Sequence, residues 1–128
     1  MAGTFDFNSL ERKYGKKVSS GLVFDSAILD LKTKDFINTI KKVFGDSFDS
    51  VFKKRKIRAG IGKMRGRKYK SSAGLLFVIG SEELMKRKGV DVVRVNDITL
   101  KDLSPNGEPG RIACYTENAI KELGEKFS

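Results

Sequence analysis

Histidine and tryptophan are absent from the 128 residues, and cysteine occurs only once, at Cys114. Without histidine, a metal or acid–base site would need carboxylates, and the only loose groupings pair Asp25 with Asp30 and Glu82 with Glu83. Carboxylates at such positions more often cap strands and helices. Cys114 falls in an apolar stretch with no histidine to activate it, which favours an inert buried thiol. The sequence therefore predicts a binding protein rather than an enzyme, with no catalytic residue, metal or cofactor.

Long apolar runs and apolar leader segments are missing as well. The longest wholly apolar run, residues 75–79, is far shorter than the roughly 20 residues that span a membrane. Residues 1–20 are polar and show no secretory signal pattern, and a single cysteine cannot form an internal disulfide. We therefore expect a cytoplasmic protein with no membrane partner. The length suits one domain, residues 1–128, with a single core.

Acidic residues are absent from one segment in particular, residues 53–70, which read KKRKIRAGIGKMRGRKYK. Ten of these eighteen residues are Lys or Arg. The whole chain has 26 basic and 16 acidic residues, so the remainder is neutral and the net charge of +10 belongs to this segment. A localised block of one sign predicts a surface that neutralises a polyanion.

The glycines in this segment, Gly60, Gly62 and Gly66, narrow the choice of polyanion. They make the segment a poor helix without the apolar face that a membrane-surface helix needs. Glycine lets the backbone approach a phosphate closely, arginine guanidinium groups fork onto phosphates, and the Tyr69 ring can stack on an unpaired base. A solvated basic loop or a nuclear import signal is the competing interpretation.

Two nucleotide-binding motifs are excluded in the same segment. A P-loop ending at Gly62-Lys63 would need glycine at Ile57 and serine or threonine at Met64. A dinucleotide fingerprint starting at Gly60 would need glycine at Arg65. The candidate RNA-binding residues are therefore Lys53, Lys54, Arg55, Lys56, Arg58, Gly60, Gly62, Lys63, Arg65, Gly66, Arg67, Lys68, Tyr69 and Lys70. Lys53 and Lys54 are the least diagnostic, because basic residues also suit the last turn of a preceding helix.

Apolar patterning predicts an α/β fold: a mainly parallel, about four-stranded sheet with helices on both faces and an extended basic loop. The expected strands are residues 21–29, 74–79, 90–95 and 111–115. Helices are expected near residues 5–18, from Thr33 to Gly45 with Val43 on the apolar face, after Ser47, over 81–88, over 100–103, and after Thr116 with Ile120 inward.

The order of these segments resembles the C-terminal half of large-subunit ribosomal protein L-four of archaea and eukaryotes. The resemblance covers residues 21–123 and includes the helix region of residues 31–45. Its short motifs are Arg58-Ala59-Gly60, Lys63-Met64-Arg65, Gly110-Arg111 after a proline/glycine-rich turn, and Thr116-Glu117 at a helix start. It implies a structural constituent of the large ribosomal subunit that binds rRNA through residues 53–70 and adds Arg111 to the RNA-binding candidates.

Members of that family are about twice as long, and their N-terminal half carries a strand and a tunnel-lining loop that have no counterpart here. The resemblance therefore implies a fragment, one product of a split gene, or a reduced protein. The expected partners are large-subunit rRNA and neighbouring ribosomal proteins, joined, if the chain is one product of a split gene, by a separate chain that supplies the N-terminal half. A free-standing RNA-binding regulatory or interaction module is the alternative function.

Overall fold

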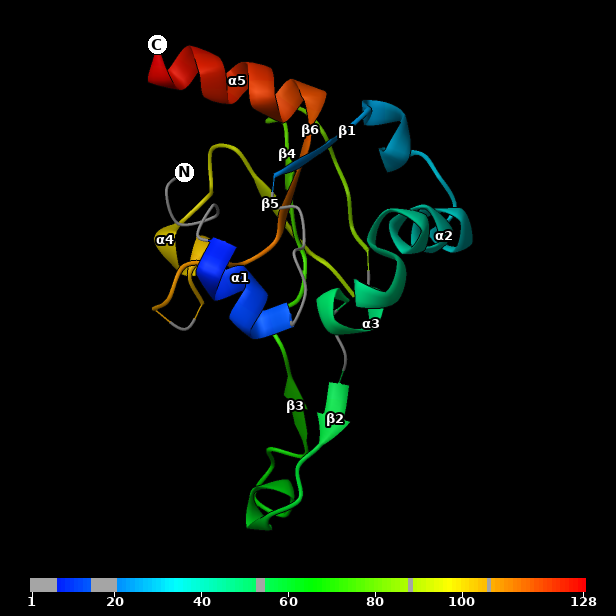
Figure 1. Ribbon diagram of the computed structural model, residues 1–128, viewed down its shortest axis with the longest axis vertical. Helices are drawn as coiled ribbons and strands as arrows, with labels where there is room; N and C mark the ends of the chain where they lie inside the picture. Colours follow the sequence, from blue (N-terminus) through cyan, green and yellow to red (C-terminus); the bar gives the residue numbers. More distant parts are fainter. Residues whose placement is uncertain (1–6, 15–20, 53–54, 88, 106) are drawn as a thin grey trace.

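The computed structural model describes residues 7–14, 21–52, 55–87, 89–105 and 107–128. Four short parallel strands form the central sheet, in the order β1-β6-β4-β5 (Figure 1). These strands are β1 (Leu22–Phe24), β4 (Leu76–Ile79), β5 (Asp91–Arg94) and β6 (Ala113–Thr116). The α/β class predicted from the sequence is thereby confirmed.

The central strand β4 shows why the sheet needs cover on both sides. All four of its residues are buried, and successive side chains of a strand point to opposite faces. Phe77 and Ile79 join one apolar cluster, whereas Leu76 and Val78 join another. A continuous apolar strand of this kind is stable only between two layers of other elements.

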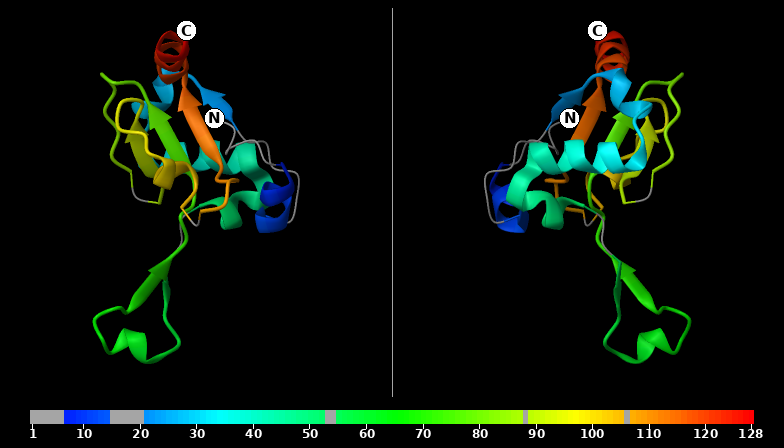
Figure 2. Two further views of the ribbon diagram at one scale, coloured as in Figure 1. Left: turned by 90° about the vertical axis from the view of Figure 1, so that its left-hand side faces the viewer. Right: turned by 90° about the vertical axis from the view of Figure 1, so that its right-hand side faces the viewer.

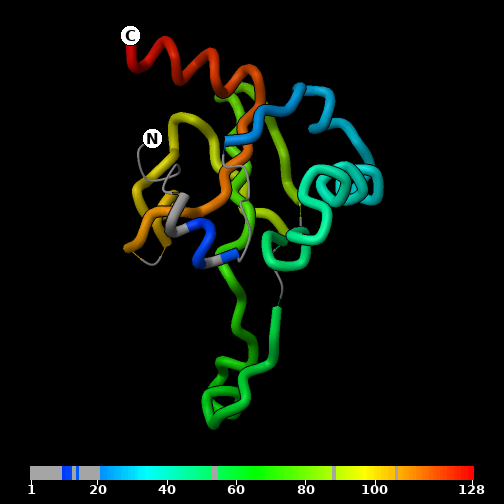
Figure 3. Tube along the Cα trace, viewed as in Figure 1, coloured from blue at the N-terminus to red at the C-terminus, as the bar shows by residue number. Residues whose placement is uncertain are grey.

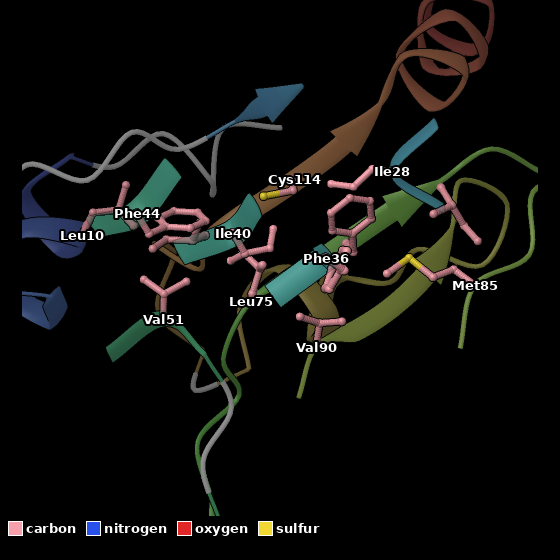
Figure 4. Close-up of a cluster of buried hydrophobic side chains, with 13 residues drawn as sticks. Leu10, Ile28, Phe36, Ile40, Phe44, Val51, Leu75, Met85, Val90 and Cys114 are labelled. Carbon is pink, nitrogen blue, oxygen red and sulfur yellow. The ribbon is translucent and has the colours of Figure 1, made fainter. Parts of the chain in front are cut away.

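Helices from the first half of the chain cover the first face of the sheet. They are α1 (Phe7–Tyr14), α2 (Thr33–Phe44) and α3 (Phe48–Val51), with the 3₁₀ turn η2 (Ser26–Leu29) beside them. Phe36 and Ile40 of α2 are almost fully buried, and the Phe36 ring meets the Phe77 ring edge-on at a centroid distance of 6.0 Å. Figure 4 shows this cluster, in which Leu10 of α1 and Val51 of α3 also lie.

The opposite face is covered by α5 (Glu117–Phe127) and α4 (Leu100–Leu103). Ala119 and Leu123 of α5 pack on Leu76, Val78 and Tyr115. The Thr116 hydroxyl accepts a hydrogen bond from the Ala119 amide and caps α5, as the sequence predicts. The chain ends with α5 at the pole of the molecule opposite the projecting residues 55–71 (Figure 3).

Two predicted elements were wrong in extent or type. The strand expected over residues 21–29 stops at Phe24, because the Asp25 carboxylate accepts from the Ala27 amide and caps η2. The helix expected over residues 81–88 does not form in the described part, residues 81–87. There the Glu83 carboxylate accepts from the Gly80 amide, and the Arg87 guanidinium donates to the Leu29 and Leu31 carbonyls.

Smaller corrections concern caps and inward faces. Ser47 makes no side-chain capping bond to α3, and the N-cap position of α2 is Lys32 rather than Thr33. Val43 and Ile120, both predicted to point inward, are 45% and 40% exposed. Thr99 and Asp102, by contrast, form a reciprocal capping box on α4.

Candidate nucleic-acid interface

The basic segment forms a two-stranded arm, residues 55–71, that projects away from the sheet and its helices (Figure 2). The strands of the arm are β2 (Arg55–Ile57) and β3 (Tyr69–Ser71), paired antiparallel with Arg55 opposite Ser71 and Ile57 opposite Tyr69. The arm is therefore a ribbon of backbone hydrogen bonds, which a basic composition alone does not predict.

The tip of the arm is a compact turn rather than an open loop. It contains the 3₁₀ turn η4 (Ile61–Lys63), and the Arg67 amide donates to the Gly62 carbonyl at 3.0 Å. Below it, the Arg58 amide donates to the Lys68 carbonyl at 2.9 Å. Gly66 has a φ of +75°, which L side chains rarely adopt, so glycine is required there.

All of the Lys and Arg side chains in the arm are exposed. They are Arg55, Lys56, Arg58, Lys63, Arg65, Arg67, Lys68 and Lys70. The ion pairs found within the described residues, Arg12–Glu108 and Arg111–Asp91, both lie on the body. Eight cationic groups on a thin ribbon therefore repel one another and face solvent, as groups that bind a polyanion would.

Two surface hollows lie along the arm. One, near the tip, is lined by Arg58, Gly60, Gly62, Arg67 and Lys70 with Ala59. The second lies where the arm meets the body and is lined by Asp49, Ser50, Phe52, Lys56, Lys70, Ser71 and Ser72. Lys70 lines both hollows, which therefore follow one another along the arm. The hollows thus bring together six of the sequence-predicted residues: Lys56, Arg58, Gly60, Gly62, Arg67 and Lys70. The others in the arm line neither hollow: Arg55, Lys63, Arg65, Gly66, Lys68 and Tyr69.

Arg111 differs from the other RNA-binding candidates, because the structure places it inside the body. Its side chain is 5% exposed. Its guanidinium donates to the Gly74, Asp102 and Ala73 carbonyls at 3.0, 2.7 and 2.8 Å, and to an Asp91 carboxylate oxygen at 2.6 Å. These partners occupy the guanidinium, although Arg111 also lines a hollow at the root of the arm with Ser71 and Ser72. Lys53 and Lys54, also predicted sites, lie outside the described residues.

The described part of the chain has no cluster of three His, Cys, Asp or Glu side chains that could hold a metal ion. Burial raises the pKa of the Cys114 thiol to about 12, so almost no thiolate forms at neutral pH. Glu122 accepts from the hydroxyl and the amide of Ser81, and these hydrogen bonds lower the pKa of its carboxyl. Its role is to hold the end of β4 against α5.

Known proteins resemble this chain over most of its length. It is 38% identical over 115 residues to the large ribosomal subunit protein uL4 of Saccharolobus solfataricus, an alignment that covers 84% of this chain and 43% of that protein. It is 40% identical over 114 residues to uL4 of Methanocaldococcus jannaschii, which covers 83% of this chain and 45% of that protein. The chain is a homologue of archaeal uL4.

A third relative, uL4 of Methanosphaera stadtmanae, is 40% identical over 112 residues, or 82% of this chain and 43% of its own length. The chain thus spans less than half the length of the uL4 proteins that it matches, while no family model matches it. The resemblance to L-four noted in the sequence is confirmed. Across the described ranges no helix has the length and apolar character needed to cross a membrane.

Proposed function

We propose that this chain is a structural component of the large ribosomal subunit and that it binds rRNA through the arm. The arm carries the proposal, because it holds eight exposed cationic side chains on a ribbon that stands apart, while the residues outside 53–70 carry no net charge. Homology to uL4, a protein named for the large subunit, supports the same partner. On this proposal the chain works in the cytoplasm, within the ribosome, and has no enzymatic activity.

Binding through such an arm depends mainly on phosphate neutralisation. If about seven of its cations contact phosphates, log K falls with log salt with a slope of about −5 to −6. Four of these cations, Lys56, Arg58, Arg67 and Lys70, line two adjoining hollows, so one RNA strand can follow the arm from the tip to the body. Selectivity then comes mainly from the shape of the folded RNA rather than from direct readout of its base sequence.

The proposal is tested with the triple variant R58A, R65A and R67A in filter binding to transcribed large-subunit rRNA over a salt series. We expect most of the affinity to disappear and the salt slope to become shallower by about 2–3, since three phosphate contacts are lost. The control is the triple variant K34A, K101A and K121A, which removes the same charge from exposed positions of the body. Equal binding by the two triple variants would contradict an interface on the arm.

A free-standing RNA-binding regulator is the alternative, and sedimentation separates it from a ribosomal component. A component of the subunit travels with large subunits through sucrose at high salt, whereas a regulator held by exposed charges alone dissociates. Neighbouring ribosomal proteins and a chain equivalent to the rest of uL4 are the further partners that this proposal includes. They would be identified by crosslinking within the purified subunit.

A further inference from the structure

The two faces of the arm differ in chemistry, as its strand register shows. Directly opposed residues of an antiparallel pair place their side chains on the same face, and neighbours along a strand alternate. Lys56 lies opposite Lys70, so one face is cationic. Ile57 lies opposite Tyr69, so the other face is apolar and aromatic. All of these residues are exposed, so both faces are open to a ligand.

The cationic face is the one with the hollows. Lys56 and Lys70 line the hollow at the base of the arm, and Lys70 continues into the hollow that Arg58 and Arg67 line near the tip. This face therefore offers positive charge along a concave track. It suits a phosphate backbone, although Asp49 and the half-buried Phe52 ring also line the hollow at the base.

The aromatic face has the opposite character. The Tyr69 ring is 48% exposed and Ile57 is 58% exposed, although both could have been polar on a solvated ribbon. The guanidinium carbon of Arg55 lies 5.4 Å from the centroid of the Tyr69 ring, and the Lys68 ammonium lies 5.7 Å from it. Cation–π contacts of this kind hold the ring in place and surround it with positive charge.

We propose that the arm binds RNA with both faces at once, the cationic face on phosphates and the Tyr69 face on an unpaired base. The inference rests on the proposed function and adds a division of labour to it. Both faces of a ribbon cannot contact the same stretch of backbone, so the arm enters between two RNA segments. Tyr69 is then the residue that selects unpaired over paired RNA, and Arg55 positions its ring.

An unpaired base fits this face better than an apolar protein surface does. A base has a flat π-face that can take the place of the Arg55 guanidinium and the Lys68 ammonium over the ring, and its own phosphate then meets these two cations. An apolar protein surface would have to bury those two charges without partners, which is costly. A base stacked on the ring displaces both cations from over it, into water or onto phosphate.

The test measures binding of the full chain to a paired RNA duplex and to the same duplex with a bulge of unpaired adenosines. We expect the wild type to prefer the bulged RNA by about 5- to 150-fold, the range that one base–aromatic stack supplies. Tyr69→Ala should abolish this preference and leave the salt slope unchanged, whereas Tyr69→Phe should retain it. Phe127→Ala, which truncates a 77% exposed aromatic ring on the body, is the matched control and should behave as wild type.

Substitutions on the cationic face should have the opposite effects on the salt slope and on the preference for bulged RNA. The double variant K56A and K70A should weaken binding to both RNAs, make the salt slope shallower by about 1.4–1.8, and keep the preference for the bulge. A Tyr69→Ala protein that still prefers bulged RNA would overturn the division into two faces. The same result is expected if the Tyr69 face binds another protein instead of RNA. Failure of the wild type to bind either RNA would instead overturn the proposed function itself.

Discussion

Replacing Arg111 with alanine should destabilise the protein by about 3 kcal/mol or more without removing any contact to RNA. The Arg111 guanidinium has three backbone carbonyls and one carboxylate as acceptors, drawn from three separate segments. Ala73 and Gly74 join the arm to β4, Asp91 begins β5, and Asp102 belongs to α4. One side chain thus holds together the start of two strands, a helix and the root of the arm.

The magnitude follows from what the substitution leaves behind. Removing one partner of a buried charge pair costs about 3–5 kcal/mol. The Asp91 side chain is 36% exposed, so water relieves part of its loss and the lower end of that range applies. The Ala73 and Gly74 carbonyls, however, lose a charged donor, and each buried carbonyl left unpaired costs about 1–3 kcal/mol. A fall in melting temperature of about 10–20 °C is expected for a chain of this size.

Urea unfolding monitored by circular dichroism measures the loss, and filter binding below the melting temperature measures the RNA affinity that remains. Arg12→Ala is the matched control, because it breaks the Arg12–Glu108 ion pair, whose side chains are 67% and 58% exposed. That control should change stability by less than about 1 kcal/mol. An Arg111→Ala protein of normal stability with a reduced salt slope would refute the reasoning and return Arg111 to the RNA-binding residues.

Three further substitutions or treatments have defined outcomes. Gly89→Ala should cost about 2–4 kcal/mol in urea unfolding, because Gly89 has a φ of +96° and the new methyl group would collide with the Phe52 ring. Cys114 should react with a thiol reagent at pH 8 only after unfolding, since burial raises its pKa to about 12; fast reaction of the native protein would contradict its burial. Ser81→Ala should raise the lowered pKa of Glu122 and reduce stability at neutral pH. Because the Glu122 carboxyl stabilises the fold only when ionised, this deficit should close as the pH falls below the group's ordinary value of 4.5, and an equal deficit in acid would exclude the linkage.

Elements with strong local patterns could be predicted from the sequence. The spacing of Phe36 and Ile40 fixes the buried face of α2, and the apolar run in β4 requires cover on both sides, so the α/β layering follows. The charge of the arm could be predicted in the same way, since it needs only composition. Its ribbon could not, because β2 and β3 pair across eleven intervening residues and each strand has only three.

The missing helix over residues 81–87 and the burial of Arg111 share a physical cause, which is the use of side chains in distant contacts, whereas the strand at residues 21–29 ends through a local hydrogen bond of Asp25. The pattern of residues 81–88 favours a helix, yet Glu83 bonds the Thr116 hydroxyl and Arg87 bonds carbonyls before α2. Thr116 is 33 residues from Glu83, and the two carbonyls are 58 and 56 residues from Arg87. The sequence assigns Arg111 to RNA because a Gly-Arg pair resembles a family motif, whereas its burial depends on segments that only the fold brings together.

The arm has no buried side chain in either strand, so its residues are less constrained by packing than those of the body. Its sequence carries little of the free energy of folding, so substitutions there change the ligand that is recognised without endangering the native state. Because Arg55 and Ser71 are direct neighbours across the ribbon, a tight Asn-Gly hairpin joining these two positions would excise the arm and spare the sheet. The arm of a relative, joined at the same two positions, would then bring its own RNA specificity to this body.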